Sequence, residues 1–318
     1  KLLMSRSEIC LHHFSLLLKE SSPHIYAKIA TMSEYFHASP RTMRRFMRVQ
    51  SLIDQLDPQA APQALLAPGS PRPRGTIIVF PGSFNPPTTA HLALLKQARQ
   101  FAYQHLCAAG GQPIQLYAAM SKRIVDKERV ERPLLLDRVM LLSLLLRRRL
   151  PHTGVMLFNR GLYVEQAQAI RTAFPRVRKL FFLIGFDKIV QILDPHYYED
   201  RDAALAELFK LAELLVAPRG TDGVDALKSL LQHPDNQPFA HYIHALPFNA
   251  AYRTISSTSI RQNSAAHWHE VPWEVRRFMS ATRAYAPPLR RVDGTTVDYY
   301  AERVKELEAR LKKLSAGR

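Results

Sequence analysis

The sequence predicts an α/β protein with a doubly wound parallel sheet. From residue 76 onward, short runs rich in β-branched and aromatic residues alternate with stretches of helical length. This alternation is typical of parallel strands joined by right-handed helical crossovers. The chain of 318 residues is 47% hydrophobic and 22% charged, which supplies a buried core and excludes a wholly disordered chain.

The alternating region predicts both the elements and the position of a site. Six strands are expected, at 76–80, 114–118, 155–158, 180–184, 214–217 and 241–246, and helical patterns near 89–107, 133–149, 161–174 and 187–210 separate the first five. Ligands of doubly wound sheets bind beyond the carboxyl ends of the strands. We therefore expect the loops after Phe80, Ala118, Ile184 and Ala217 to line one crevice.

The flanking sequence predicts a four-part chain. Residues 1–56 are expected to form an N-terminal basic helical extension, 57–75 a proline-rich linker, 76–286 the main domain and 287–318 a C-terminal amphipathic helix. The N-terminal helix begins at Ser39 and Pro40. It either docks on the main domain with its arginines in solvent or presents them to nucleic acid or lipid; these arginines are Arg41, Arg44, Arg45 and Arg48. The C-terminal stripe packs on the domain or on a second subunit, which would make a homo-oligomer.

Charge and cysteine content narrow the partners and the compartment. The net charge of +17, from 44 Lys and Arg against 27 Asp and Glu, points to nucleic acid, an acidic membrane surface or small phosphorylated substrates. Cys10 and Cys107 make neither a disulfide framework nor a zinc spacing, so a cytoplasmic protein is expected. No run of about 18 apolar residues occurs, so no membrane span is expected.

The loop after the first expected strand has the features of a phosphate site. Gly82 and Ser83 allow a tight turn close to a ligand, and Thr88 or Thr89 can begin a helix with His91 in its first turn. The N-terminus of a helix carries about half a unit of positive charge and suits phosphate. Taken alone, a histidine after a turn is more often structural than catalytic.

A second hydroxyl-rich segment follows the sixth expected strand. Ser256, Ser257 and Thr258 offer hydroxyls and backbone N–H groups at an expected helix start, and Arg261 lies about one turn further on. All four can face one anion. Without the first loop, a Ser/Thr cap with a surface arginine would explain this segment equally well.

Together, the two segments resemble the signatures of the nicotinamide/nicotinate mononucleotide adenylyltransferases, within the nucleotidyltransferase superfamily marked by H-x-G-H or T-x-x-H. The family's second signature, I-S-S-T-x-x-R, matches residues 255–261, and the resemblance covers about residues 76–285. It implies a Rossmann-like nucleotidyltransferase domain that transfers AMP from ATP to nicotinamide or nicotinate mononucleotide. The first signature, G-x-F-N-P-x-T-x-x-H, matches Gly82, Phe84, Asn85, Pro86, Thr88 and His91.

The resemblance also implies roles for single residues. His91, Arg261 and Lys127 would be catalytic, with Lys122 as the rival of Lys127. Magnesium would arrive with ATP, because no carboxylate cluster suits a dedicated metal site. The implied ATP-binding residues are Gly82, Ser83, Phe84, Thr88, His91, Gly185, Asp187, Ser256, Ser257, Thr258 and Arg261.

Acceptor binding is implied for Asn85, Tyr163 and Arg219. Relatives stack a tryptophan on the pyridine ring, and no tryptophan lies between His91 and Asp187, so an aromatic substitute is needed. Tyr163 is the preferred substitute for stacking on the pyridine ring. For Asp187, the alternative to a role in binding ATP is to cap the helix that follows it. The other aromatic candidates are Phe158, Tyr197 and Tyr198.

Two further classes of function remain open. One is another cytidylyltransferase-like enzyme that makes a CDP-activated product or dephospho-coenzyme A. The other is a nucleotide-binding regulatory protein that holds nucleic acid with the basic helix around Arg41 to Arg48. Pyrophosphate release from ATP and CTP with several acceptors distinguishes the first class, and steeply salt-dependent binding of DNA or RNA would support the second.

Overall fold

A seven-stranded sheet forms the centre of the protein, in the order β1-β4-β3-β2-β5-β6-β7. The structure is a computed structural model that describes residues 39–105, 114–122, 132–220, 223–290 and 294–316. Every neighbouring pair of strands is parallel except β1 and β4, so the predicted α/β fold with a doubly wound, Rossmann-like sheet is confirmed. The strands are β1 (Ala64–Leu66), β2 (Gly75–Pro81), β3 (Ile114–Ser121), β4 (Thr153–Phe158), β5 (Val177–Gly185), β6 (Glu213–Ala217) and β7 (Ile243–Ala245).

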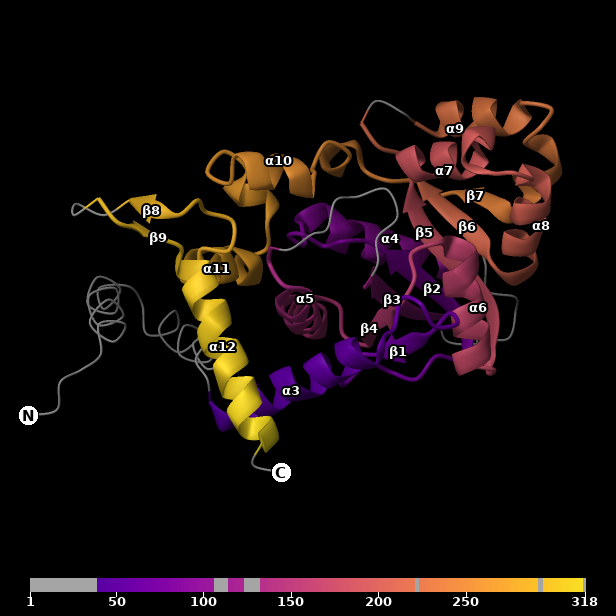
Figure 1. Cartoon of the computed structure of the whole chain (residues 1–318). Helices are drawn as coiled ribbons and strands as arrows, with labels where there is room; N and C mark the ends of the chain where they lie inside the picture. The colour runs from indigo at the N-terminus through magenta and orange to yellow at the C-terminus, as the bar shows by residue number, and fades with distance from the viewer. Residues whose placement is uncertain (1–38, 106–113, 123–131, 221–222, 291–293, 317–318) are drawn as a thin grey trace, which may run out of the picture.

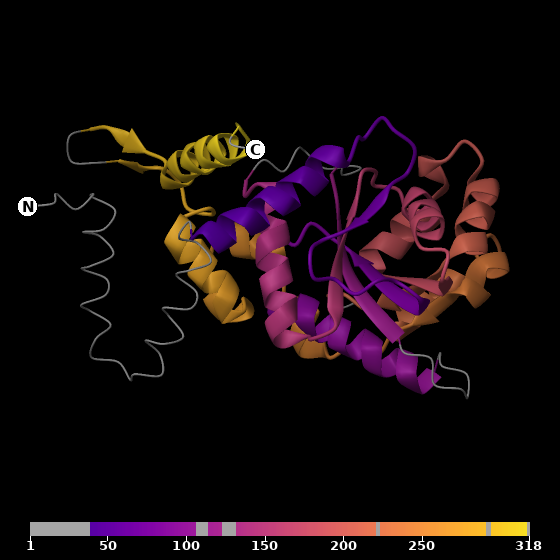
Figure 2. The same cartoon turned by 90° about the horizontal axis from the view of Figure 1, so that it is seen from below.

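Helices cover both faces of the sheet, which explains why the central strands are almost continuously apolar (Figures 1 and 2). Alternate residues of β2 enter different cores: Ile78 packs with α3, α4 and α5, whereas Ile77 and Val79 pack with α6, α7 and α8. The helices are α3 (Pro40–Gln55), α4 (Thr89–His105), α5 (Leu135–Arg149), α6 (Tyr163–Ala173), α7 (Phe186–Leu193), α8 (Arg201–Leu211), α9 (Val224–Gln232), α10 (Ser257–Gln262), α11 (Trp273–Thr282) and α12 (Tyr299–Ala316).

Three local expectations need correction. The segment 287–318 is not helical throughout, because β8 (Leu289–Arg290) and β9 (Thr296–Val297) pair as a small antiparallel sheet before α12 begins at Tyr299. The helical pattern at 187–210 is two helices, because Pro195 has no N–H to donate and the chain turns there, with Asp194 accepting a hydrogen bond from the N–H of His196. The proline-rich segment also contributes a strand that was not predicted. β1 lies between Pro62 and Pro68 at the sheet edge, where prolines interrupt no further ladder.

The basic helix α3 docks on the main domain. Ser39 caps it by accepting a 3.2 Å hydrogen bond from the N–H of Thr42, and its buried side chains pack against α5. Arg41, Arg44 and Arg48 remain exposed on its outer face. Residues 1–38 of the predicted extension lie outside the described residues.

The C-terminal helix α12 is fastened to the same body by a buried ion pair. Asp137 of α5 is 1% exposed and accepts two hydrogen bonds from the guanidinium of Arg303, at 2.7 and 2.8 Å. The hydroxyl of Tyr300 donates to the same carboxylate at 2.6 Å. The apolar stripe of α12 therefore packs on its own chain, with Leu307 in the core and Leu314 exposed.

In the part of the chain that the structure describes, no helix has the length and apolarity that crossing a membrane requires.

Candidate active site

The candidate site lies at the carboxyl end of β2, which pairs with β3 on one side and with β5 on the other. The chain order reverses at this strand, and such a switch point is where doubly wound sheets bind their ligands. The loop after β2 is tightly packed. Phe84 has a φ of +43° and is fully buried, and a Cβ atom at Gly82 would lie 3.2 Å from its ring. Glycine at this position therefore lets the loop fold over its own phenylalanine.

His91 is held in one tautomer by this loop. Its Nδ1 accepts a 2.9 Å hydrogen bond from the backbone N–H of Thr88, and the Thr88 hydroxyl lies 2.8 Å from the same nitrogen. Because Nδ1 accepts a hydrogen bond from an N–H group, the proton of the neutral ring is on Nε2. Burial first, and the charge of Arg219 second, lower the pKa of His91 to about 4. At neutral pH the ring is an uncharged donor through Nε2.

The second hydroxyl-rich segment contacts the first loop directly. Ser257 Oγ donates a 2.8 Å hydrogen bond to the carbonyl of Pro86, and Arg261 donates to the carbonyl of Asn85 at 2.5 Å. Arg261 also donates to Thr258 Oγ1 at 3.2 Å, and Ser256 caps α10 by accepting from the N–H of Ser259. Two segments more than 160 residues apart in the sequence thus form one surface.

Three residues predicted to contact ligands have buried side chains that serve the loop instead. Thr88 is fully buried and orients His91, and Phe84 packs on the ring of His91 with 5.0 Å between centroids. Asn85 is 3% exposed and uses both ends of its amide within the protein. Its Oδ1 accepts from the hydroxyl of Tyr285 at 2.8 Å, and its Nδ2 donates to the carbonyl of Arg132 at 3.3 Å.

The ends of β5 and β6 add an ion pair to this edge. Arg219 donates to Asp187 at 2.9 Å, and both side chains are about half exposed. A Cβ atom at Gly185 would lie 2.6 Å from Asp187 Oδ1, so the carboxylate occupies the space that glycine leaves. The alternative reading of Asp187 as a cap is wrong, because α7 begins at Phe186 and its N-terminus has no side-chain cap.

The two candidate lysines have different outcomes. Lys127 lies outside the described residues. Lys122 donates through Nζ to the carbonyl of Ile53 at 2.9 Å, at the end of α3. This bond ties β3 to the N-terminal helix and gives Lys122 a structural partner.

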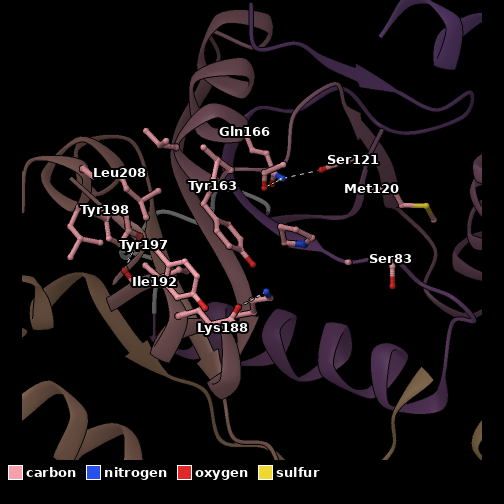
Figure 3. A pocket seen from close by; sticks show the side chains of 18 of the residues that line it. Ser83, Met120, Ser121, Tyr163, Gln166, Lys188, Ile192, Tyr197, Tyr198 and Leu208 are labelled. Carbon is pink, nitrogen blue, oxygen red and sulfur yellow. Dashed lines mark hydrogen bonds between the residues drawn. The ribbon is translucent and has the colours of Figure 1, made fainter. Parts of the chain in front are cut away.

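A cavity of about 570 Å³ opens beside the loop (Figure 3). Gly82 and Ser83 form part of its wall, and Tyr163, Tyr197 and Tyr198 line it from α6 and from the turn after α7. Phe158 is 1% exposed and belongs to the core, so it does not face this space. Three of the four aromatic candidates for ring stacking therefore share one cavity.

Two buried polar residues of the cavity wall had no role assigned from the sequence. Arg138 is 4% exposed and donates to the carbonyl of Ser83 at 3.0 Å, while its Nε has no partner among the residues that the structure describes. Burial lowers the pKa of its guanidinium. Gln166 is 3% exposed and lies one turn after Tyr163. For Gln166, the only sequence signal was a polar residue within an apolar helical pattern.

The described residues contain no group of three or more His, Cys, Asp or Glu side chains that could hold a metal ion.

No protein-family model matches the chain, and no curated protein matches its sequence. In contrast, 56 chains of solved structures match it. One is a Vibrio parahaemolyticus protein provisionally named as a nicotinate-nucleotide adenylyltransferase, with 13% identity and a TM-score of 0.38. The match covers 67% of this chain and 96% of that chain, and at this TM-score it does not bear on function.

Proposed function

We propose that the protein is a nucleotidyltransferase that transfers AMP from ATP to nicotinamide or nicotinate mononucleotide, forming NAD or its deamido form and pyrophosphate. The observation that carries the proposal is the contact between the two motif segments. Arg261 and Ser257 bond to consecutive carbonyls of the loop that orients His91. A neutral imidazole donor and a guanidinium beside one loop suit a phosphate chain.

In the proposed reaction, a phosphate oxygen of the mononucleotide attacks the α-phosphorus of ATP. A new phosphorus–oxygen bond forms, the bond from the α-phosphorus to the bridging oxygen breaks, and pyrophosphate leaves with that oxygen. No covalent enzyme intermediate is needed, so catalysis depends on alignment and on stabilisation of charge around the phosphorus. His91 would donate through Nε2 to an oxygen of the α-phosphate.

The second segment, residues 256–261, carries groups that suit the negative charge of the leaving pyrophosphate. Ser257, Thr258 and Arg261 would hold the β- and γ-phosphates, and Lys127 would add a further positive charge. A hydrogen bond from a charged group is worth about 1.5–3 kcal/mol. Arg261 is already fixed by Asn85 and Thr258, so little side-chain freedom would be lost when phosphate binds.

Magnesium would be bound mainly by the triphosphate and water. Asp187, a carboxylate at this edge, is paired with Arg219, and the described residues offer no cluster of metal ligands. Magnesium in such sites keeps several waters and binds substrate phosphates. Its bound positive charge would offset part of the charge on the triphosphate.

The acceptor would occupy the cavity beside the loop. Its volume of about 570 Å³ is within the range of about 300–1,000 Å³ that is usual for small-molecule sites. Arg138 and Ser83 lie at its loop end, and Tyr163 and Tyr197 line it from α6 and the turn after α7. This arrangement supports an anionic group near the loop and a planar ring further in.

The test is to incubate the full chain with ATP and each of the two mononucleotides in parallel and to determine the product masses. A dinucleotide and pyrophosphate are expected with ATP, and much less product with CTP. If neither dinucleotide forms, the proposal fails. Product with CTP and another acceptor would then indicate a different nucleotidyltransferase, and ATP binding without turnover a regulatory protein.

A further inference from the structure

We propose that Gln166 and Ser121 make the acceptor site selective for a ring that bears a carboxamide over one that bears a carboxylate. This inference rests on the proposed function and deepens it, because it selects one of the two pyridine mononucleotides. Gln166 is 97% buried, given its 3% exposure, and both residues line the cavity beside Tyr163. Figure 3 shows the hydrogen bond between them at the cavity wall.

The orientation of the Gln166 amide is fixed by its partners. Nε2 donates to the carbonyl of Gly161 at 3.1 Å and to Ser121 Oγ at 3.1 Å. A backbone carbonyl only accepts hydrogen bonds, so a flipped amide would place Oε1 against the oxygen of Gly161. In the orientation that remains, Oε1 is buried and has no hydrogen-bond partner within the described part of the chain. A buried acceptor without a donor is unfavourable and favours a ligand that supplies one.

Ser121 supplies the complementary group. Its Oγ accepts from Gln166, which leaves the hydroxyl proton free to be donated. The pair therefore offers one acceptor, Gln166 Oε1, and one donor, the Ser121 hydroxyl. A primary carboxamide has an N–H donor and a carbonyl acceptor and satisfies both. A carboxylate has acceptors only and would bring negative charge toward the oxygen of Gln166.

The position of Gln166 relative to Tyr163 also favours a ring that bears a carboxamide. Tyr163 and Gln166 are three residues apart on α6, so their side chains lie on one face of the helix. A ring stacked on Tyr163 would bring its substituent toward Gln166. Two cations that line the cavity oppose this preference. Arg138 lies at the loop end, where it donates to the carbonyl of Ser83, and Lys188 donates to Gln191 Oε1 at 2.6 Å. Lys188 is less buried than Gln166 and is screened more strongly by water.

The experiment compares kcat/KM for nicotinamide and nicotinate mononucleotides at saturating ATP. The wild-type protein is expected to prefer the amide by at least about tenfold, the effect of one unsatisfied buried polar group. Gln166→Met is expected to lower kcat/KM for the amide by about ten- to a hundredfold and to change that for the acid much less. Ser121→Ala is expected to reduce the preference in the same direction.

The matched control is Gln168→Met, since Gln168 lies on the same helix α6 but is exposed and does not line the cavity. Its ratio of amide to acid is expected to equal that of the wild type. A wild-type preference for the acid, or a ratio that Gln166→Met leaves unchanged, overturns the inference while the proposed function stands. Turnover of neither mononucleotide by the wild type contradicts the proposed function, and the inference with it. The wild-type ratio decides the point even where a variant fails to fold.

Discussion

Replacing His91 with alanine tests the group that we place at the α-phosphate. The substitution removes the Nε2 donor and leaves the backbone N–H of Thr88 without its acceptor. The imidazole also packs against the buried rings of Phe80 and Phe84, with centroids 5.7 and 5.0 Å away. His91→Asn, which keeps a polar side chain of smaller size, complements the alanine variant.

The expected loss is large because the donor acts where charge develops. Removing one preorganised donor of this kind typically costs about 2.7–4 kcal/mol, which is a factor of about 10² to 10³ in kcat. Since the pKa of His91 is lowered to about 4, the ring is neutral throughout the working range. A general-base role near pH 6.5 is therefore not expected, and the wild-type rate should show no titration of His91 between pH 6 and 8.

The assay is pyrophosphate release with ATP and mononucleotide, together with circular dichroism to confirm the fold and calorimetry to measure ATP binding. His105→Ala is the matched control, because His105 lies at the other end of the same helix and packs on Phe101. It should retain the wild-type rate. A folded His91→Ala protein with the wild-type kcat would refute the role of the imidazole.

Three further predictions follow from named contacts. Arg261→Lys removes the planar group that contacts Asn85 and Thr258, and should raise the KM for ATP about tenfold or more in steady-state kinetics; an unchanged KM would exclude a phosphate contact. Arg303→Met leaves the carboxylate of Asp137 buried without its cation and should lower the free energy of unfolding, measured in urea, by about 3–5 kcal/mol. A loss below about 1 kcal/mol would show that the ion pair does not fasten α12. Because the pKa of His91 is lowered, the folded state disfavours protonation of the imidazole. The free energy of unfolding is therefore expected to fall by about 3 kcal/mol as the pH decreases from above 6.5 toward 4. His91→Gln should flatten this dependence of stability on pH, and an equal dependence in both proteins would contradict the lowered pKa.

The parallel strands could be predicted because burial on both faces makes them continuously apolar, as in β2 and β5. β1 could not, since three residues between prolines have no detectable period. The break between α7 and α8 could have been expected from Pro195, but the apolar pattern on either side concealed it.

The sequence identified two motif segments that the structure brings into contact, but it did not reveal the direction of their side chains. A motif identifies Asn85 and Thr88 without showing that both point into the protein. Their partners are too far along the chain for any local pattern to reveal, as with Tyr285, which is 200 residues from Asn85. The structure thus separates motif residues that are buried in the loop from those, such as Arg261, that remain exposed.

The central claim is that the mononucleotide phosphate attacks the α-phosphorus of ATP. The most direct measurement uses nicotinamide mononucleotide with ¹⁸O in its phosphate, incubated with ATP and the full chain, followed by mass analysis of both products. The dinucleotide is expected to retain all of the label, and the pyrophosphate to carry none. Labelled pyrophosphate, or hydrolysis of ATP without a dinucleotide, would contradict it.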